Sequence, residues 1–142
     1  MAWATRRSSQ FSYPHGISIS PDGGALFVAD YGNDKIRRVE VATGAVTTVA
    51  GSGENGDADG VGDAAEFCCP TGVAISPDGG ALFVADYGND KIRRVEVATG
   101  AGEVRTIAGS DEAGDADGLG DAAEFCSPTG LAISPDGSAL FV

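Results

Sequence analysis

The chain has 142 residues, of which 21 are acidic and 9 basic, giving a formal net charge of −12 at pH 7. Such an acidic chain lacks the basic face that nucleic-acid phosphates and anionic membranes require. Its apolar share of 42% excludes a generic disordered polymer. No apolar run approaches the ~20 residues of a membrane-spanning helix, and the basic N-terminus, Met1 to Arg7, is followed by no apolar core of a secretory signal. We expect a soluble domain whose cellular compartment the sequence leaves open.

The sequence contains a long internal repeat. The residues from Ile19 to Ala45 recur without change from Ile75 to Ala101, and a third copy starts at Ile133. Such self-similarity is typical of repeat architectures. We therefore divide the chain into an N-terminal extension, two full units and the start of a third unit, with the bounds 1–10, 11–66, 67–124 and 125–142.

Each unit is predicted to form four short β-strands. The first alternates apolar and polar residues, the second is a continuous apolar run, and the third is rich in β-branched residues. In the first unit the strands are expected at residues 16–20, 25–30, 35–41 and 46–50. Residues typical of tight turns separate them, at 21–24, 31–34 and 42–44. No stretch has a sustained helical period.

Four antiparallel strands per unit form a sheet that cannot cover its own two apolar faces. Copies stacked radially around an axis cover each other, as in a β-propeller. We therefore predict an all-β fold: a β-propeller fragment with four-stranded antiparallel blades and about two and a third repeats. Because a propeller has roughly 4–8 blades, and the last strand breaks off at Val142, we expect further blades in cis, or oligomerisation, to close the ring.

The repeat resembles the NHL family of β-propellers. The resembling residues of the first unit, which recur in the second, are Pro14-x-Gly16-Ile17, Pro21-Asp22-Gly23, Leu26 to Asp30, Asn33-x-x-Ile36-Arg37 and Thr43-Gly44. The turn and the run after it are shared with YVTN-type and gluconolactonase-like propellers. The resemblance implies a six-bladed propeller that serves as a non-enzymatic binding or scaffold module. The alternative that it implies is part of a metal-dependent gluconolactonase-like hydrolase.

The units are near-identical, whereas a catalytic propeller should have divergent blades with individual polar residues. We therefore favour a binding module and expect no catalytic residue. The lone His15 has no evident nucleophile partner for a Ser-His-Asp arrangement. Cys68, Cys69 and Cys126 lack the spacing of a zinc site or a disulfide framework. The binding partner, a protein or a small ligand, is not identified by the sequence.

Acidic residues gather in two loops, 53–66 and 110–124, which contain no Lys or Arg. The first loop fits the calcium-binding pattern D-x-[DN]-x-[DN]-G-x5-E, except that Asn55 stands first. We interpret both loops as solvated connectors, with a weak calcium site as the alternative and no other cofactor. The candidate ligands are Asn55, Asp57, Asp59, Asp63 and Glu66 in the first loop, and Asp115, Asp117, Asp121 and Glu124 in the second.

Repeated turns supply the remaining candidates for binding. Tyr31 and Tyr87, with Asn33 and Asn89, lie in turns that a propeller would present at one face, so they are candidate contact residues. The pairs Asp30–Asn33 and Asp86–Asn89 recur in each blade, which favours capping of the turn over a single metal site.

Overall fold

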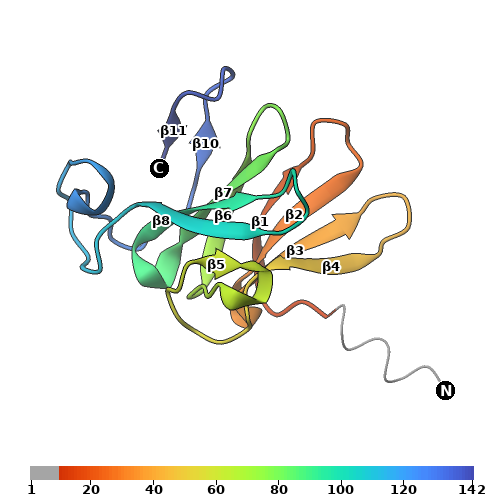
Figure 1. Ribbon diagram of the computed structural model, residues 1–142, viewed down its shortest axis with the longest axis horizontal. Helices are drawn as coiled ribbons and strands as arrows, with labels where there is room; N and C mark the ends of the chain where they lie inside the picture. The colour runs from red at the N-terminus through yellow and green to blue at the C-terminus, as the bar shows by residue number, and fades with distance from the viewer. Residues whose placement is uncertain (1–9) are drawn as a thin grey trace.

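The computed structural model describes residues 10–142 and confirms an all-β fold of antiparallel sheets arranged like neighbouring propeller blades (Figure 1). The strands of the first sheet follow chain order and are β1 (Pro14–Ile19), β2 (Ala25–Asp30), β3 (Lys35–Glu40) and β4 (Val46–Ala50). Three of the four predicted strands match to within one residue; β1 begins two residues earlier than predicted. The sheets do not close into a ring within the described residues.

The second sheet repeats the first and gains one strand. Its repeated strands are β6 (Pro70–Ile75), β7 (Ala81–Asp86), β8 (Lys91–Glu96) and β9 (Glu103–Ala108). The additional strand, β5 (Gly60–Val61), pairs with β9, the last of these four strands. The connection between the sheets therefore belongs structurally to the second sheet.

The third unit begins with a short hairpin of β10 (Ala132–Ile133) and β11 (Leu140–Phe141). The described helices are single 3-10 turns, namely η2 (Tyr31–Asn33), η3 (Gly62–Ala64), η4 (Tyr87–Asn89) and η5 (Gly120–Ala122). None of the helices in residues 10–142 is long and apolar enough to cross a membrane.

We call the first strand of each sheet, β1 or β6, its inner strand, because β1 and β6 contact each other. Side-chain hydrogen bonds stabilise the turn that follows each inner strand. Asp22 accepts hydrogen bonds from the Ser20 hydroxyl at 2.6 Å and the Gly24 amide at 2.8 Å. These two donors lower the pKa of Asp22. Gly23 adopts a φ of 75°, which a residue without a Cβ adopts freely. The Ser-Pro-Asp-Gly sequence therefore fixes the hairpin between β1 and β2.

The two sheets bury one hydrophobic core between them. Ala25, Phe27 and Ala29 of β2 belong to the same buried cluster as Leu82 and Val84 of β7. This arrangement is the one expected of stacked blades, because each sheet covers the apolar face of its neighbour.

The opposite face of the first sheet is exposed to solvent, unlike the equivalent face of the second sheet. Ile17 and Ile19 of β1 are 59% and 55% exposed, whereas Val73, which occupies the position of Ile17 in the second sheet, is 7% exposed. The second sheet is covered at this position by the first, and the first sheet presents the same position to solvent.

Successive inner strands approach each other closely at one glycine. A Cβ on Gly16 would lie 2.4 Å from the Thr71 carbonyl oxygen, and one on Gly72 would lie 2.2 Å from the Thr129 oxygen. Gly130 is the third copy of this position, and a Cβ there would meet no atom within 4 Å. The glycine is therefore required only where a following strand is packed against it.

We predict that Gly72→Ala destabilises the fold by about 1–3 kcal/mol, because the added methyl group forces the inner strands apart. Gly130→Ala is the matched control and should change the free energy of unfolding by no more than about 0.5 kcal/mol. Urea denaturation followed by circular dichroism measures both values. Equal effects of the two substitutions would contradict close packing of the inner strands.

Candidate functional site

The turns that contain the tyrosines lie at the end of the sheets where the inner strands begin, which we call the entry end. Pro14 is the register partner of Asp30, and Pro70 is the partner of Asp86. The segment after each second strand therefore lies beside the start of its inner strand. This register brings the repeated turns and the acidic loops to one end of the molecule.

A hollow of about 400 Å³ opens at the entry end between successive repeats. Its lining comes from three consecutive copies of the inner strand and two copies of the tyrosine turn, namely His15, Gly16, Tyr31, Thr71, Tyr87 and Thr129. The rings of His15 and Tyr31 stack with centroids 4.5 Å apart, and those of Tyr31 and Tyr87 are 6.4 Å apart. Aromatic side chains from two blades thus share one surface.

His15 was not predicted to belong to this surface. As a lone histidine without a nucleophile partner, it carried no catalytic signal. It shares its repeat position with Thr71 and Thr129, and all three residues line the hollow. A hydrogen bond with the Cys69 thiol raises the pKa of Tyr31.

Asn33 and Asn89 hold the carboxylates that precede their turns. The Asn33 amide donates to Asp30 Oδ2 at 2.9 Å, and the Asn89 amide donates to Asp86 Oδ2 at 2.8 Å. The Asn89 amide also donates to the Gly56 carbonyl at 2.8 Å. Neither asparagine lines the hollow with the tyrosines.

Each of these carboxylates is fully buried in an ion pair with an arginine of the third strand. Asp86 Oδ2 lies 2.7 Å from Arg93 Nη1, and both side chains have no exposed surface. Asp86 also accepts a hydrogen bond from the Cys68 amide at 2.9 Å. Burial raises the pKa of Asp86, against the effect of its donors and of the Arg93 charge. The same pair joins Asp30 to Arg37 at 2.9 Å in the first sheet.

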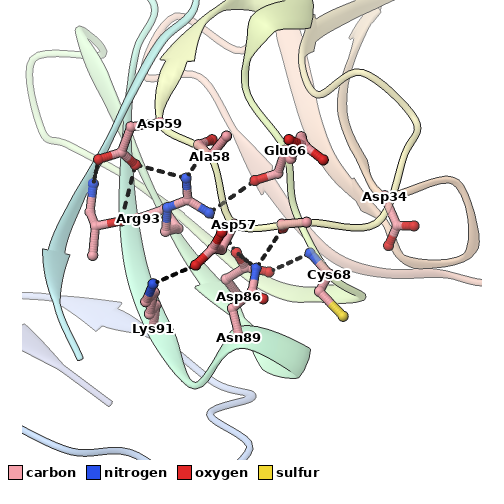
Figure 2. A network of polar contacts seen from close by, with 12 residues as sticks. Asp34, Asp57, Ala58, Asp59, Glu66, Cys68, Asp86, Asn89, Lys91 and Arg93 are labelled. Atoms are coloured by element: carbon pink, nitrogen blue, oxygen red, sulfur yellow. Dashed lines mark hydrogen bonds and ion pairs between the residues drawn. The ribbon is translucent and has the colours of Figure 1, made fainter. Parts of the chain in front are cut away.

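Arg93 also holds the acidic connection that precedes its sheet (Figure 2). Its Nη1 donates to the Glu66 carbonyl at 3.0 Å, and its Nη2 donates to the Ala58 carbonyl at 3.0 Å and to Asp59 Oδ1 at 2.8 Å. The guanidinium lies 5.2 Å from the centre of the Phe67 ring. One side chain therefore ties strand β8 to the middle and the C-terminal end of the loop.

The structure places two of the calcium candidates of the first loop against basic groups of β8. Asp57 pairs with the Lys91 ammonium at 3.0 Å, and Asp59 pairs with Arg93. Asn55 lies elsewhere and donates to Cys68 Sγ at 2.9 Å. Within residues 10–142 no group of three or more His, Cys, Asp or Glu side chains is arranged to hold a metal ion.

The same contacts shift the pKa values of the loop carboxylates. The hydrogen bond from Lys91, followed by its charge, lowers the pKa of Asp57. Burial opposes ionisation of Asp59, but hydrogen bonds from Thr106 and Arg93 outweigh it and lower the pKa of Asp59. Lys91 is desolvated, yet its bonds to Asp111 and Asp57 raise its pKa. All these shifts favour the charged forms that pair.

We predict that Asp86→Ala destabilises the fold by about 3–5 kcal/mol, because it leaves Arg93 buried without its carboxylate. Glu96→Ala is the control, since it breaks the more exposed pair of Glu96 with Arg94 and should cost no more than about 1 kcal/mol. Thermal and urea unfolding measure the two losses. A loss for Asp86→Ala no larger than that of the control would show that the buried pair is not structural.

We further predict that the contribution of Asp57 and Asp59 to stability is lost in acid. Their pKa values are lowered on folding, so this stability is present above the ordinary value of 3.8 and declines as the pH falls through the lowered values. A double Asp57→Asn, Asp59→Asn variant should be less stable than the wild type at pH 6, with a gap that narrows below pH 3.8. Urea unfolding across this range measures the gap, with Asp63→Asn as the control, and a gap independent of pH would contradict the assignment.

Comparison with known proteins identifies the repeats. The NHL repeat matches residues 11–38 and 67–94. Protein SUPPRESSOR OF QUENCHING 1, chloroplastic, of Arabidopsis thaliana is 35% identical over 98% of this chain, and the human NHL repeat-containing protein 2 is 30% identical over 75% of it. The chain spans 14% and 15% of the lengths of these two relatives.

A solved structure has the same fold. An auxiliary nutrient binding protein from Bacteroides thetaiotaomicron superposes with a TM-score of 0.73 at 24% identity, covering 88% of this chain and 33% of its own. The repeated sheets, their buried Asp–Arg pairs and the sequence matches agree with one another. The chain is therefore an NHL-repeat segment built of β-propeller blades.

Proposed function

We propose that this segment is a non-enzymatic binding module that contacts its partner through the hollow at the entry end. The observation that carries the proposal is the stacking of His15 on Tyr31 beside Tyr87 at the junction of two blades. Rigid aromatic rings with polar edges provide a large contact area at a low entropic cost. The threonine hydroxyls of the lining supply hydrogen-bonding groups that can orient a ligand.

The repeated acidic residues support binding over hydrolysis. A gluconolactonase-like site would need carboxylates and amides that are free to hold a divalent cation. Asp86 and Asn89 bond instead to each other and, in the case of Asp86, to Arg93 and the Cys68 amide. Asp30 and Asn33 repeat this arrangement. These side chains serve the fold of each blade, which leaves the aromatic surface as the better candidate for function.

The lining also indicates the chemistry of the partner. Its rings and hydroxyl groups suit a peptide loop or small molecule that presents an apolar or aromatic group with a polar edge. The auxiliary nutrient binding protein that shares the fold is consistent with such a role, although a shared fold alone does not assign function. The six-bladed ring expected from the NHL resemblance would place this hollow near its axis.

The test is a ligand screen by nuclear magnetic resonance on the isotope-labelled chain, with a library of short peptides and aromatic fragments. We expect binders to shift the amide signals of Tyr31 and Tyr87, and the double Tyr31→Ala, Tyr87→Ala variant to lose the binding. Tyr13→Ala is the matched control, because Tyr13 is 78% exposed and lies outside the hollow. Binding that survives the double variant, or turnover of a lactone in the presence of calcium, would contradict the proposal.

A further inference from the structure

The second unit carries two adjacent cysteines, Cys68 and Cys69, where the other units carry at most one. The same two positions hold Ser12 and Tyr13 in the first unit, and Cys126 and Ser127 in the third. Because the units are otherwise near-identical, the fold of a blade does not require a pair of thiols at these positions. The pair is therefore a candidate for a separate chemical role.

Both cysteines are held at the junction of the two sheets by their backbone amides. The Cys68 amide donates to Asp86 Oδ1 at 2.9 Å (Figure 2), and the Cys69 amide donates to Asp34 Oδ1 at 2.7 Å. Asp86 ends strand β7 of the second sheet, whereas Asp34 follows the turn η2 in the first sheet. One carboxylate from each sheet thus fixes the backbone of the pair.

The two thiols lie against each other and are within reach of solvent. Consecutive side chains of an extended strand point to opposite faces, but Cys69 departs from this conformation with a φ of 54°. The thiols of Cys68 and Cys69 share a hydrogen bond. Both residues are partly exposed, so that a small reagent can reach the two sulfur atoms.

Each thiol has one further partner, and these partners belong to different parts of the molecule. The Asn55 amide of the first acidic loop donates to Cys68 Sγ at 2.9 Å. The Cys69 thiol is hydrogen-bonded to the phenol of Tyr31, whose ring stacks on His15 in the hollow. A change at the thiols therefore reaches the aromatic surface directly.

The spacing of the two cysteines determines what kind of disulfide they can form. The peptide bond between them is trans, and consecutive Cα atoms across a trans peptide are about 3.8 Å apart. Ordinary disulfides join Cα atoms about 4.4–6.8 Å apart. A disulfide between these neighbours is therefore strained, and strained, partly exposed disulfides are readily reduced.

We propose that Cys68 and Cys69 form a reversible modification site, at which a low-molecular-weight disulfide such as glutathione disulfide oxidises them to a disulfide between neighbours. The thiolate of one cysteine attacks the reagent and releases one reduced glutathione. The thiolate of the other then attacks the protein sulfur of this mixed disulfide and releases the second glutathione. The protein loses two hydrogen atoms and two electrons, which the two glutathione molecules gain.

Oxidation changes the surroundings of Tyr31. A disulfide sulfur has no proton and is drawn toward its partner, so Cys69 loses its hydrogen bond with the Tyr31 phenol. Because Tyr31 lines the hollow, the shape of this surface then depends on the oxidation state of the pair. An effect on ligand binding rests on the proposed function of the hollow, whereas the disulfide and the change at Tyr31 do not.

The experiment treats the full, reduced chain with glutathione disulfide and analyses it by mass spectrometry with peptide mapping. We expect the peptide that contains Cys68 and Cys69 to lose two hydrogen atoms and to carry no glutathione, and dithiothreitol to restore it. Cys126 is the matched control in the same molecule, because it occupies the repeat position of Cys68 with Ser127 beside it. It should form the mixed disulfide with glutathione and proceed no further.

Nuclear magnetic resonance tests the effect on the hollow. The amide and ring signals of Tyr31 should shift when the chain is oxidised and return when it is reduced. In the double Cys68→Ser, Cys69→Ser variant, the same treatment should leave the Tyr31 signals unchanged. This variant still contains Cys126, so it separates the effect of the pair from that of glutathione on the third cysteine.

Single variants test whether both cysteines are needed. Cys68→Ser and Cys69→Ser should each retain glutathione on the remaining thiol, since no second thiol displaces it. Serine is the natural residue at these positions in other units, as Ser12 and as Ser127, which has a φ of 52°. Circular dichroism checks that each variant is folded. Glutathione retained on the natural pair, a disulfide that includes Cys126, unreactive thiols or an unshifted Tyr31 signal would overturn the proposal.

Discussion

The buried ion pair between Asp86 and Arg93 is the interaction on which the second blade depends. Asp86 joins the end of β7 to the amide before β6 and to the turn that follows it. Arg93 connects β8 to carbonyls in the middle and at the C-terminal end of the acidic loop. A pair of charges in a dry interior depends on hydrogen bonds to its polar groups, and both Nη atoms of Arg93 have such partners, whereas its buried Nε has none among the described residues. The contacts of Asp86 and Arg93 therefore fix β6, the turn η4 and the acidic loop relative to one another.

The pair also explains why each repeated turn presents a tyrosine to the hollow, and not the carboxylate that precedes the tyrosine. The carboxylate that ends each second strand is directed inward, so the next residue, Tyr31 or Tyr87, reaches the hollow. The position of the tyrosines is thus a consequence of where the aspartates must be buried. Binding chemistry and blade stability are built into the same short segment, but they use different side chains.

Much of this fold could be predicted from the sequence. Alternation in the first strand and the apolar run in the second are local signals, and the repeat multiplies them. Strand β5 could not be predicted because Gly60–Val61 is too short and too rich in glycine to show a period. The partners of Asp57 and Asp59 were missed for another reason. They lie 34 residues further along the chain, and local motifs carry no information about such contacts. The residues of the loop alone therefore allowed a weak calcium site beside the solvated connector that we favoured, and they gave no sign that Asp57 and Asp59 pair with Lys91 and Arg93.

The pairing of β5 with β9 joins the end of the first sequence unit to the second sheet. The identical stretch of sequence ends at Ala45, before the acidic connection. The connection itself shares backbone hydrogen bonds with the sheet that follows it. A segment transferred between such proteins would keep its fold only if it included the acidic loop that precedes its sheet. Recombination within the loop would separate an arginine from the oxygens that surround it. The structural unit is therefore offset from the repeat seen in the sequence, because it begins with the loop that precedes its sheet.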